Sequence, residues 1–423
     1  MQRNGVLPPR SRRAFLQLSA AASAAVALRA VTEPMLAHAA RISSFHKDAV
    51  MIDSNENPLG PGEAAREAVA GIVSQGGRYC PWLTEDLEST IAELEGLKPE
   101  YVRTFPGSSS PLHYAVLAYT SPAKSYVTAD PGYEAGMMAA MVSGARIVKV
   151  GLTKSHAHDM RAMLAAARDA GVFYICSPNN PTGTLTDHSD IEYLLENKPK
   201  KSILLIDEAY IHFSDAKSTV DLVKADKDVV VLRTFSKIYG MAGLRCGFAL
   251  GRPDLLAKLD AYTGWNSLPI TAMIAAMASL KDAQLVPQRK RINATIREAV
   301  FQWLDRQGYS YIPSQSNCFM LDVKRPAKDV IAAMALQNVF IGRVWPAMPT
   351  YARITVGTGP EMERFQAAFQ HVMTGAAAGR VEQAPVMLSE NVDGAPRRAT
   401  RTFGTRLAGY MAANSNRLPA DVT

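Results

Sequence analysis

Lys237 is the residue whose neighbours point most clearly to chemistry. It comes shortly after Val229–Leu232, an apolar run that predicts a buried strand, and this strand leads into Thr234 and Ser236. Arg245 follows eight positions after the lysine. A lysine becomes a good nucleophile when burial or nearby cations lower its pKa. The two hydroxyls and the guanidinium can hold a phosphate dianion through charge-assisted hydrogen bonds.

This combination predicts a covalent bond between the lysine amine and a cofactor that carries both an aldehyde and a phosphate, which describes pyridoxal phosphate. For an isolated Ser-Lys pair the alternative is a surface lysine beside a structural ion pair. Charged groups with shifted pKa values occur in structural ion pairs as well as in functional sites. The other polar clusters of the chain weigh against that alternative.

Two of these clusters can contact such a cofactor. Gly107–Ser110 leads into a helix predicted to begin near Pro111, and backbone N–H groups at a helix start bind anions. An ordinary helix cap is the alternative. Tyr133 follows Pro131 and Gly132 at a strand end, where an aromatic ring can stack on a flat cofactor. A tyrosine of the core or of a turn would show the same pattern.

Two more clusters carry an amide and a carboxylate. Asn180 lies in Pro178–Gly183, which could be a tight turn only, or could present the amide to the cofactor's phenolic oxygen. Asp207 ends the apolar run Ile203–Ile206, and a carboxylate beside a pyridine nitrogen keeps that nitrogen protonated. Tyr210 can hydrogen-bond the phenolic oxygen. A strand-ending acid followed by a helix cap is the structural alternative.

Arg353 interrupts the apolar strand predicted at Ala352–Val356. Buried arginine is rare unless it is paired. Its planar guanidinium matches a substrate carboxylate or phosphate, and a structural salt bridge is the alternative.

The elements that must position these residues form an alternating pattern. The chain has 423 residues, 48% of them hydrophobic and 20% charged, which predicts a soluble globular protein with two domains. Between Tyr101 and Gly251, seven short apolar runs alternate with helical patterns, which predicts an α/β fold with a mainly parallel sheet. Such sheets bind ligands at the carboxyl ends of their strands, where the polar clusters fall. After Gly264, a long helix over Leu285–Arg306 and several short strands predict a smaller α+β domain.

The N-terminus resembles an export signal. Ser11–Leu16 reads SRRAFL, similar to the twin-arginine signal, and the apolar stretch Ala14–Leu28 is short for a membrane span. Ala37–Ala39 fits an A-x-A cleavage site. An alanine-rich helix or a basic leader is the alternative.

Charge and cysteine content limit the partners. Most of the net charge of +7 lies in the two ends of the chain, so we expect no nucleic-acid surface. The four cysteines are widely spaced and predict neither a metal site nor a disulfide framework.

Five motifs together resemble the histidinol-phosphate aminotransferase group of the fold type I pyridoxal phosphate enzymes, and they occur in the expected order across 53–373. They are NENPLGPG (Asn55–Gly62), PNNPTG (Pro178–Gly183), DEAY (Asp207–Tyr210), RTFSKIYGMAGLRCG (Arg233–Gly247) and ARITVGT (Ala352–Thr358). The resemblance implies a three-layer α/β/α large domain with a mainly parallel seven-stranded sheet, a small α+β C-terminal domain and pyridoxal phosphate as the cofactor.

The resemblance also implies roles for single residues. Lys237 would bond to the cofactor and later shuttle the substrate proton, Asp207 would pair with the pyridine nitrogen, Tyr210 and Asn180 would bind the phenolic oxygen, and Tyr133 would stack on the ring. The residues expected to hold the phosphate are Ser108, Ser109, Thr234, Ser236 and Arg245.

Substrate and partner contacts are implied in the same way. Arg353 would bind the substrate carboxylate or phosphate, with Arg343 as a second substrate-side arginine and Asn55 beside them. Tyr79 matches a tyrosine that reaches the phosphate of the neighbouring subunit, so a homodimer is implied.

Several positions depart from the family pattern. Ser109 and Ser110 stand where an acidic pair is usual, Gly136 replaces a second aromatic residue, and Cys80 separates Tyr79 from Pro81. The export signal is foreign to an enzyme of histidine biosynthesis. These departures leave the substrate open.

The sequence therefore predicts an exported pyridoxal phosphate-dependent aminotransferase acting between an amino acid, or a histidinol phosphate-like amine, and a 2-oxo acid. A decarboxylase, lyase or oxidase on the same fold is the alternative, and a non-catalytic protein that retains the cofactor is a third. We expect a periplasmic protein carried by the twin-arginine export machinery, or one tethered to the membrane by an uncleaved signal. The predicted segments are 1–39 (signal), 40–100 (arm and helices of the small domain), 101–264 (large domain), 265–373 (small domain) and 374–423 (extension, expected to be mobile).

Overall fold

Two large hydrophobic cores organise the part of the chain that the structure describes, and a small third cluster is formed by Ile312, Met320 and Trp345. The structure is a computed structural model that describes residues 48–375, so the predicted export signal and nearly all of the predicted C-terminal extension lie outside it. The larger core is built from side chains between Ala65 and Leu285, and the smaller core from Val50, Ile52 and side chains between Val300 and Val372.

The larger core surrounds a seven-stranded sheet with the strand order β2-β8-β7-β6-β5-β3-β4. Strand β8 is antiparallel to both of its neighbours, and the other pairs are parallel. Every residue of β5, β6 and β7 is buried, because a parallel sheet is covered on both faces. The bounds are β2 (Val102–Phe105), β3 (Ser125–Asp130), β4 (Ile147–Gly151), β5 (Ala170–Cys176), β6 (Ile203–Asp207), β7 (Val229–Thr234) and β8 (Gly247–Gly251).

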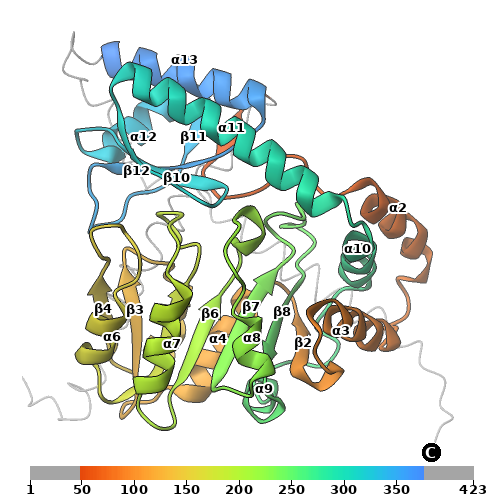
Figure 1. Ribbon diagram of the computed structural model, residues 1–423. Helices are drawn as coiled ribbons and strands as arrows, with labels where there is room; N and C mark the ends of the chain where they lie inside the picture. The colour runs from red at the N-terminus through yellow and green to blue at the C-terminus, as the bar shows by residue number, and fades with distance from the viewer. Residues whose placement is uncertain (1–47, 376–423) are drawn as a thin grey trace, which may run out of the picture. The chain divides into compact units, whose positions relative to one another are not determined.

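Helices cover both faces of this sheet. In Figure 1, α7 and α8 lie in front of the strands and α4 lies behind them, which makes three layers. The mainly parallel α/β fold expected from the sequence is thus confirmed. The helices that follow the strands are α4 (Ser109–Tyr119), α5 (Ala135–Ser143), α6 (Met160–Ala166), α7 (His188–Asn197), α8 (Val220–Lys224) and α9 (Pro253–Asp260).

The smaller core joins the two ends of the described chain. Strand β1 pairs in parallel with β11, and β10 lies between β9 and β12 in a separate antiparallel sheet. The long helix α11 and the helices α12 and α13 pack over these strands (Figure 1). The bounds are β1 (Val50–Ile52), α11 (Leu285–Gln307), β9 (Ser310–Ile312), β10 (Cys318–Asp322), α12 (Ala327–Leu336), β11 (Val339–Ile341), β12 (Tyr351–Thr355) and α13 (Gly359–Gly375).

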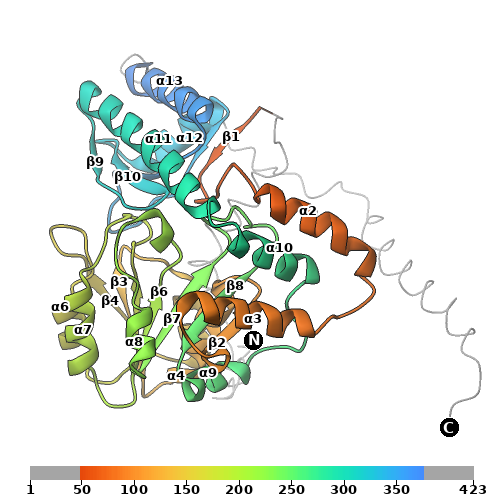
Figure 2. The same cartoon turned by 45° about the vertical axis from the view of Figure 1, so that its right-hand side comes forward.

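Helices α2 (Glu63–Ile72) and α3 (Trp82–Glu95) correct one expectation. The sequence analysis assigned them to the small domain, but their buried side chains, such as Ala65 and Leu87, belong to the larger core. Figure 2 shows both helices beside α10 (Ile270–Lys281), which packs against them. An apolar helix stripe predicts that a helix has a partner, but does not say which one. Within residues 48–375, no helix has both the length and the apolarity needed to cross a membrane.

Candidate active site

Lys237 lies just after β7, where the N-terminal arm crosses the sheet edge. We use "the arm" for residues 53–62. The Lys237 amine, Nζ, donates hydrogen bonds to the backbone carbonyls of Asn55 at 3.0 Å and Ser54 at 3.4 Å. Burial, and after it the positive charge of the nearby Arg353 guanidinium, lower the pKa of Lys237 to about 8. A substantial fraction of the amine is therefore neutral, and nucleophilic, near neutral pH.

Asp207 ends β6 and is buried. Its carboxylate accepts hydrogen bonds from the Tyr174 hydroxyl at 2.8 Å and from the Ala209 backbone N–H at 3.1 Å. Burial raises the pKa of Asp207 to about 6, although both hydrogen bonds and the charge of Lys237 oppose that rise. A cation facing this carboxylate would recover the free energy lost by burying its charge.

Tyr174 was not singled out from the sequence. It lies on β5, which pairs in parallel with β6, and this pairing brings its hydroxyl to Asp207. The available signal was a hydroxyl group inside an apolar buried run, since a buried tyrosine usually finds a polar partner.

A cradle of hydroxyls and one guanidinium lies between the ends of β2 and β7. Arg245 reaches the Ser236 hydroxyl at 3.5 Å and the Pro106 carbonyl at 3.3 Å, and the Thr234 hydroxyl donates to Ser236 at 2.9 Å. Gly107 has φ +81°, and a Cβ there would lie 2.3 Å from Arg245. The glycine is therefore needed for the close approach of the arginine to this loop.

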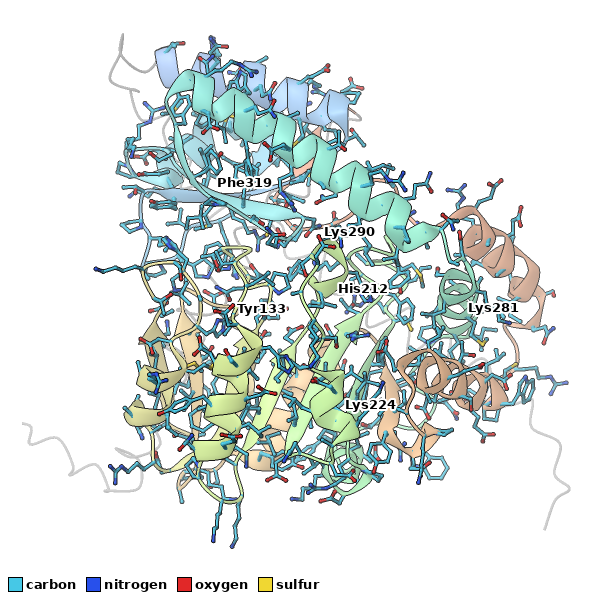
Figure 3. All side chains as sticks on the ribbon, in the orientation of Figure 1. Tyr133, His212, Lys224, Lys281, Lys290 and Phe319 are labelled. Carbon is cyan, nitrogen blue, oxygen red and sulfur yellow. The ribbon has the colours of Figure 1, made fainter. Side chains whose placement is uncertain are left out.

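Helix α4 begins at the same cradle. Ser108 is its N-cap residue, yet its side chain makes no capping hydrogen bond. The Ser109 hydroxyl lies 3.4 Å from the Tyr133 hydroxyl, which places Tyr133 beside the helix start. Figure 3 shows Tyr133 at the edge of the large domain that faces the small domain. A helix N-terminus with available hydroxyls binds phosphate groups well.

Tyr210 and Asn180 are held by the arm and by the small domain. Asn55 donates from its amide to the Tyr210 hydroxyl at 3.0 Å, and Arg353 donates to Asn180 Oδ1 at 2.9 Å. The latter bond identifies which end of the Asn180 amide is the oxygen, so its NH₂ group is the end left to donate.

Arg353 is buried, with 6% of its surface exposed, and it pairs with no carboxylate among residues 48–375. It donates to Asn180 and to the backbone carbonyl of Asp53, whereas its Nε is buried with no hydrogen-bond partner. The structural salt bridge considered from the sequence is not present in this part of the chain. A buried cation without a counter-charge is costly, which favours an anionic ligand at this guanidinium.

Arg343 follows β11 and lies beside Arg353. It forms an ion pair with Glu134 at 2.5 Å, and its guanidinium lies 4.6 Å from the centre of the Trp345 ring. The Arg353 guanidinium lies 5.4 Å from the same ring, which is buried and donates its N–H to the Gly132 carbonyl. Glu134 and Trp345 were not singled out from the sequence.

Tyr79 lies at the surface of the single chain, with 76% of its area exposed. Val73 and Trp82, which are near it in sequence, are also more than half exposed.

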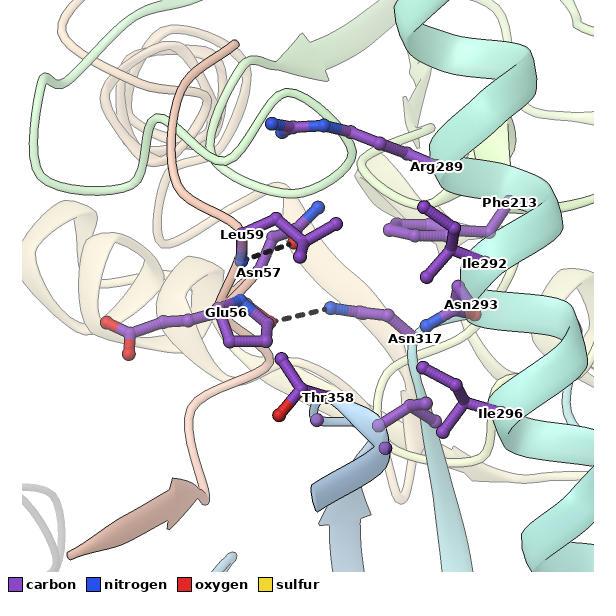
Figure 4. Close-up of a pocket in the computed structure, with 14 residues that line it drawn as sticks. Glu56, Asn57, Leu59, Phe213, Arg289, Ile292, Asn293, Ile296, Asn317 and Thr358 are labelled. Carbon is purple, nitrogen blue, oxygen red and sulfur yellow. Dashed lines mark hydrogen bonds between the residues drawn. The ribbon is translucent and has the colours of Figure 1, made fainter. Parts of the chain in front are cut away.

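A cavity of about 240 Å³ separates the arm from α11 (Figure 4). Its walls include Phe213, Ile292 and Asn317. The Asn317 amide donates to the backbone carbonyls of Asn55 at 3.1 Å and Glu56 at 3.2 Å. One carbonyl of the arm, that of Asn55, therefore accepts from Asn317 of the small domain and from Lys237 of the large domain.

These groups fit pyridoxal phosphate. Lys237 supplies an amine with a lowered pKa, and Asp207 is a buried carboxylate whose pKa is raised by burial. The cradle at Arg245 and the start of α4 supply phosphate donors, and Tyr133 lies between this cradle and the substrate-side arginines. The fold therefore brings together all of the residues predicted to bind the cofactor except Tyr79.

Known proteins are similar to this chain over most of the described residues. The family model described as aminotransferase class I and II matches residues 47–369. A histidinol-phosphate aminotransferase of Symbiobacterium thermophilum is 32% identical over 328 residues, covering 76% of this chain and 90% of that protein. An aromatic amino acid aminotransferase of Cutibacterium acnes is 32% identical over 337 residues, covering 79% of this chain and 95% of that protein.

Solved structures show the same relationship. The histidinol-phosphate aminotransferase of Sinorhizobium meliloti, solved in complex with pyridoxal-5'-phosphate, is similar with a TM-score of 0.72 and 25% identity, and the match covers 78% of this chain and 91% of that one. The L-threonine-O-3-phosphate decarboxylase of Porphyromonas gingivalis, at 18% identity and a TM-score of 0.66, shares the fold alone. The chain therefore belongs to the class I and II aminotransferase family and is a pyridoxal phosphate-dependent aminotransferase.

Proposed function

We propose that this aminotransferase acts between an α-amino acid, or a histidinol phosphate-like amine, and a 2-oxo acid, with Arg353 binding the anionic group of both substrates. The observation that carries the proposal is the buried Arg353 guanidinium, which has a free Nε and no carboxylate partner among the described residues. It is close enough to Lys237 to lower the pKa of that lysine. A substrate anion on Arg353 would thus lie beside the catalytic amine.

Each residue of the site has a separate task in this proposal. When bound, pyridoxal phosphate supplies an electron sink that stabilises negative charge at the substrate Cα. Lys237 Nζ, as the neutral amine, removes the proton from Cα, and the Asn55 carbonyl orients that nitrogen. Asp207 would keep the ring nitrogen of the cofactor protonated, and the Tyr174 hydroxyl holds the carboxylate in place. Tyr210 and the Asn180 amide would bind the phenolic oxygen.

The proposal is tested by titrating the purified holoenzyme with single amino donors while the cofactor absorbance is recorded. The panel contains histidinol phosphate, glutamate, and aromatic and basic amino acids. Stoichiometric conversion of the cofactor to its aminated form by one donor, reversed by a 2-oxo acid, is the expected result. Release of carbon dioxide or ammonia without a 2-oxo acid acceptor would instead support the decarboxylase or lyase alternative.

The pH dependence of cofactor attachment follows from the lowered pKa of Lys237. Only the neutral amine attacks the aldehyde, so the attachment rate to cofactor-free enzyme is expected to rise about tenfold per pH unit below pH 8 and to level off above it. Stopped-flow absorbance between pH 6 and 9 measures this rate. Nα-acetyl-lysine in the same buffers is the control, because it carries an ordinary amine and corrects for ionisation of the cofactor itself. A rate that still rises about tenfold per pH unit between pH 8 and 9, as expected for the ordinary lysine value of 10.5, would contradict the assignment.

We also propose that the enzyme is a homodimer in which Tyr79 contributes to the phosphate site of the partner subunit. The exposure of Tyr79 and Trp82 on one chain supports this proposal. The Lys237→Ala and Tyr79→Ala variants are each expected to have low activity. When the two variants are mixed and refolded together, activity should return. With statistical pairing about half of the dimers contain one subunit of each variant, and one of the two sites in each such dimer is intact. The recovered activity should therefore reach up to about a quarter of the wild-type value. No recovery on mixing would overturn the shared site.

The export route is proposed from the SRRAFL segment at the N-terminus. Expression of the full chain followed by cell fractionation should place it in the periplasm, either released or membrane-tethered. Replacing Arg12 and Arg13 by lysine should retain it in the cytoplasm. Unchanged export of that double variant would exclude the twin-arginine route.

A further inference from the structure

The ion pair between Glu134 and Arg343 changes what the substrate site can bind. Glu134 precedes α5 on the large domain, whereas Arg343 follows β11 on the small domain. The two side chains meet at 2.5 Å. Both side chains are more than a third exposed, and an ion pair of that kind contributes little on its own.

The buried Trp345 ring holds this pair in place. The Arg343 guanidinium stacks on the ring at 4.6 Å, which limits the conformations open to the arginine. The ring is itself fixed by its hydrogen bond to Gly132, two residues before Glu134. Arg343 and Glu134 are thus anchored to the same short segment, and the guanidinium is not free to turn fully toward a substrate.

The net charge of the side chains around Arg353 determines which substrate anion can be bound there. Arg353 and Arg343 would supply two positive charges, and Glu134 cancels one of them. A single positive charge balances a carboxylate. A phosphate monoester carries a charge of roughly −1.5 to −2 near pH 7, so it would leave an uncompensated negative charge beside Glu134. Like charges placed together discriminate strongly against the wrong ligand.

We infer that Glu134 makes the site selective for substrates that carry a carboxylate, the α-amino acids, over phosphate monoesters such as histidinol phosphate. This inference rests on the aminotransferase activity and names its substrate class. Glu134 is a specificity residue: it acts through Arg343, by occupying the second guanidinium that a dianion would need.

The sharpest comparison uses L-histidine and histidinol phosphate, because the two share the amine and the imidazole and differ in one substituent of Cα, a carboxylate in the first and a phosphorylated hydroxymethyl group in the second. For the wild-type holoenzyme, kcat/KM is expected to be at least about tenfold higher for L-histidine. The Glu134→Gln variant keeps the shape of the side chain and removes its charge, so the ratio of the two kcat/KM values should shift toward histidinol phosphate by about tenfold or more. Wild-type preference for histidinol phosphate, or a ratio that the variant leaves within twofold, would overturn the inference.

Two further variants separate charge selection from structural damage. Glu196→Gln removes an exposed carboxylate on α7 and should leave the ratio unchanged. The double variant Glu134→Gln, Arg343→Gln removes both members of the pair and should return the ratio close to that of the wild type. A double variant that keeps the phosphate preference of Glu134→Gln would show that Arg343 is not the group involved.

Binding of simple anions gives a second readout that does not need turnover. Acetate and methyl phosphate are titrated into the holoenzyme, and the cofactor fluorescence reports occupancy of the site. The Glu134→Gln variant should bind methyl phosphate at least about tenfold more tightly than the wild type, with acetate affinity changed less than threefold. Equal effects on both anions would overturn the inference. If no amino donor reacts while the anions show this difference, the aminotransferase proposal fails and the charge selection stands.

Discussion

Replacing Lys237 by alanine is expected to abolish both the covalent attachment of the cofactor and turnover, with kcat reduced by at least about 10⁴-fold. Lys237 is the lysine whose amine is held against the arm carbonyls, at 3.0 Å from Asn55, with a pKa lowered to about 8. The variant loses the nucleophile that bonds to the cofactor and the base that moves the Cα proton. The other side chains of the site remain.

Absorbance spectra and steady-state rates with the best amino donor measure the effect. The control is Lys281→Ala, an exposed lysine at the end of α10, which should keep the wild-type spectrum and rate. Addition of a small primary amine should restore part of the activity of Lys237→Ala, because an external base can enter the space left by the side chain. A Lys237→Ala enzyme with wild-type turnover would refute the assignment of the site.

Replacing Asp207 by asparagine is expected to lower kcat by about 10³-fold, a loss in the range found when a buried charge that stabilises a transition state is removed. The carboxylate is buried and positioned by Tyr174 and Ala209. An amide of the same shape keeps the packing but provides no negative charge opposite the ring nitrogen. Stopped-flow measurement of the half-reaction with one amino donor separates this chemical step from cofactor binding.

The pH dependence of cofactor affinity provides the control for Asp207. Since burial raises the pKa of Asp207 to about 6, the carboxyl becomes neutral as the pH falls through 6, and the wild-type affinity for cofactor should fall with it. The Asp207→Asn variant has no group that titrates there and should lack this decrease. Tyr174→Phe removes a hydrogen bond that lowers the pKa of Asp207, so the decrease should begin at a higher pH. Identical profiles for all three proteins would contradict the role of the carboxylate.

The mainly parallel sheet could be predicted from the sequence, and with it the approximate place of the site. Apolar runs that end in polar residues predict strands whose carboxyl ends meet at one edge, which brings together Asp207 at the end of β6 and Lys237 just after β7. The packing of α2 and α3 could not be predicted in this way, because the apolar stripe of an amphipathic helix does not indicate which core the helix packs against.

The contacts that tune the site were not accessible from the sequence. Tyr174 reaches Asp207 through the register of β5 against β6, and Glu134 meets Arg343 from a different domain. The acceptors of the Lys237 amine are backbone carbonyls of the arm. Because every residue has a backbone carbonyl, the sequence does not indicate which of them accept these hydrogen bonds. Pairwise geometry between distant segments, rather than residue type, determines these contacts.

The separation along the chain between the arm and β12 has a consequence for synthesis on the ribosome. Asn55 bonds to Thr355, and Asp53 to Arg353, across 300 residues in each case. At about 5–20 residues per second, translation of the intervening chain takes roughly 15–60 s. Throughout that interval the arm has none of its native partners from β12, so the lysine pocket is completed only after nearly the whole catalytic region has left the ribosome. A nascent chain halted before Arg353 can contain a formed sheet and still lack the site.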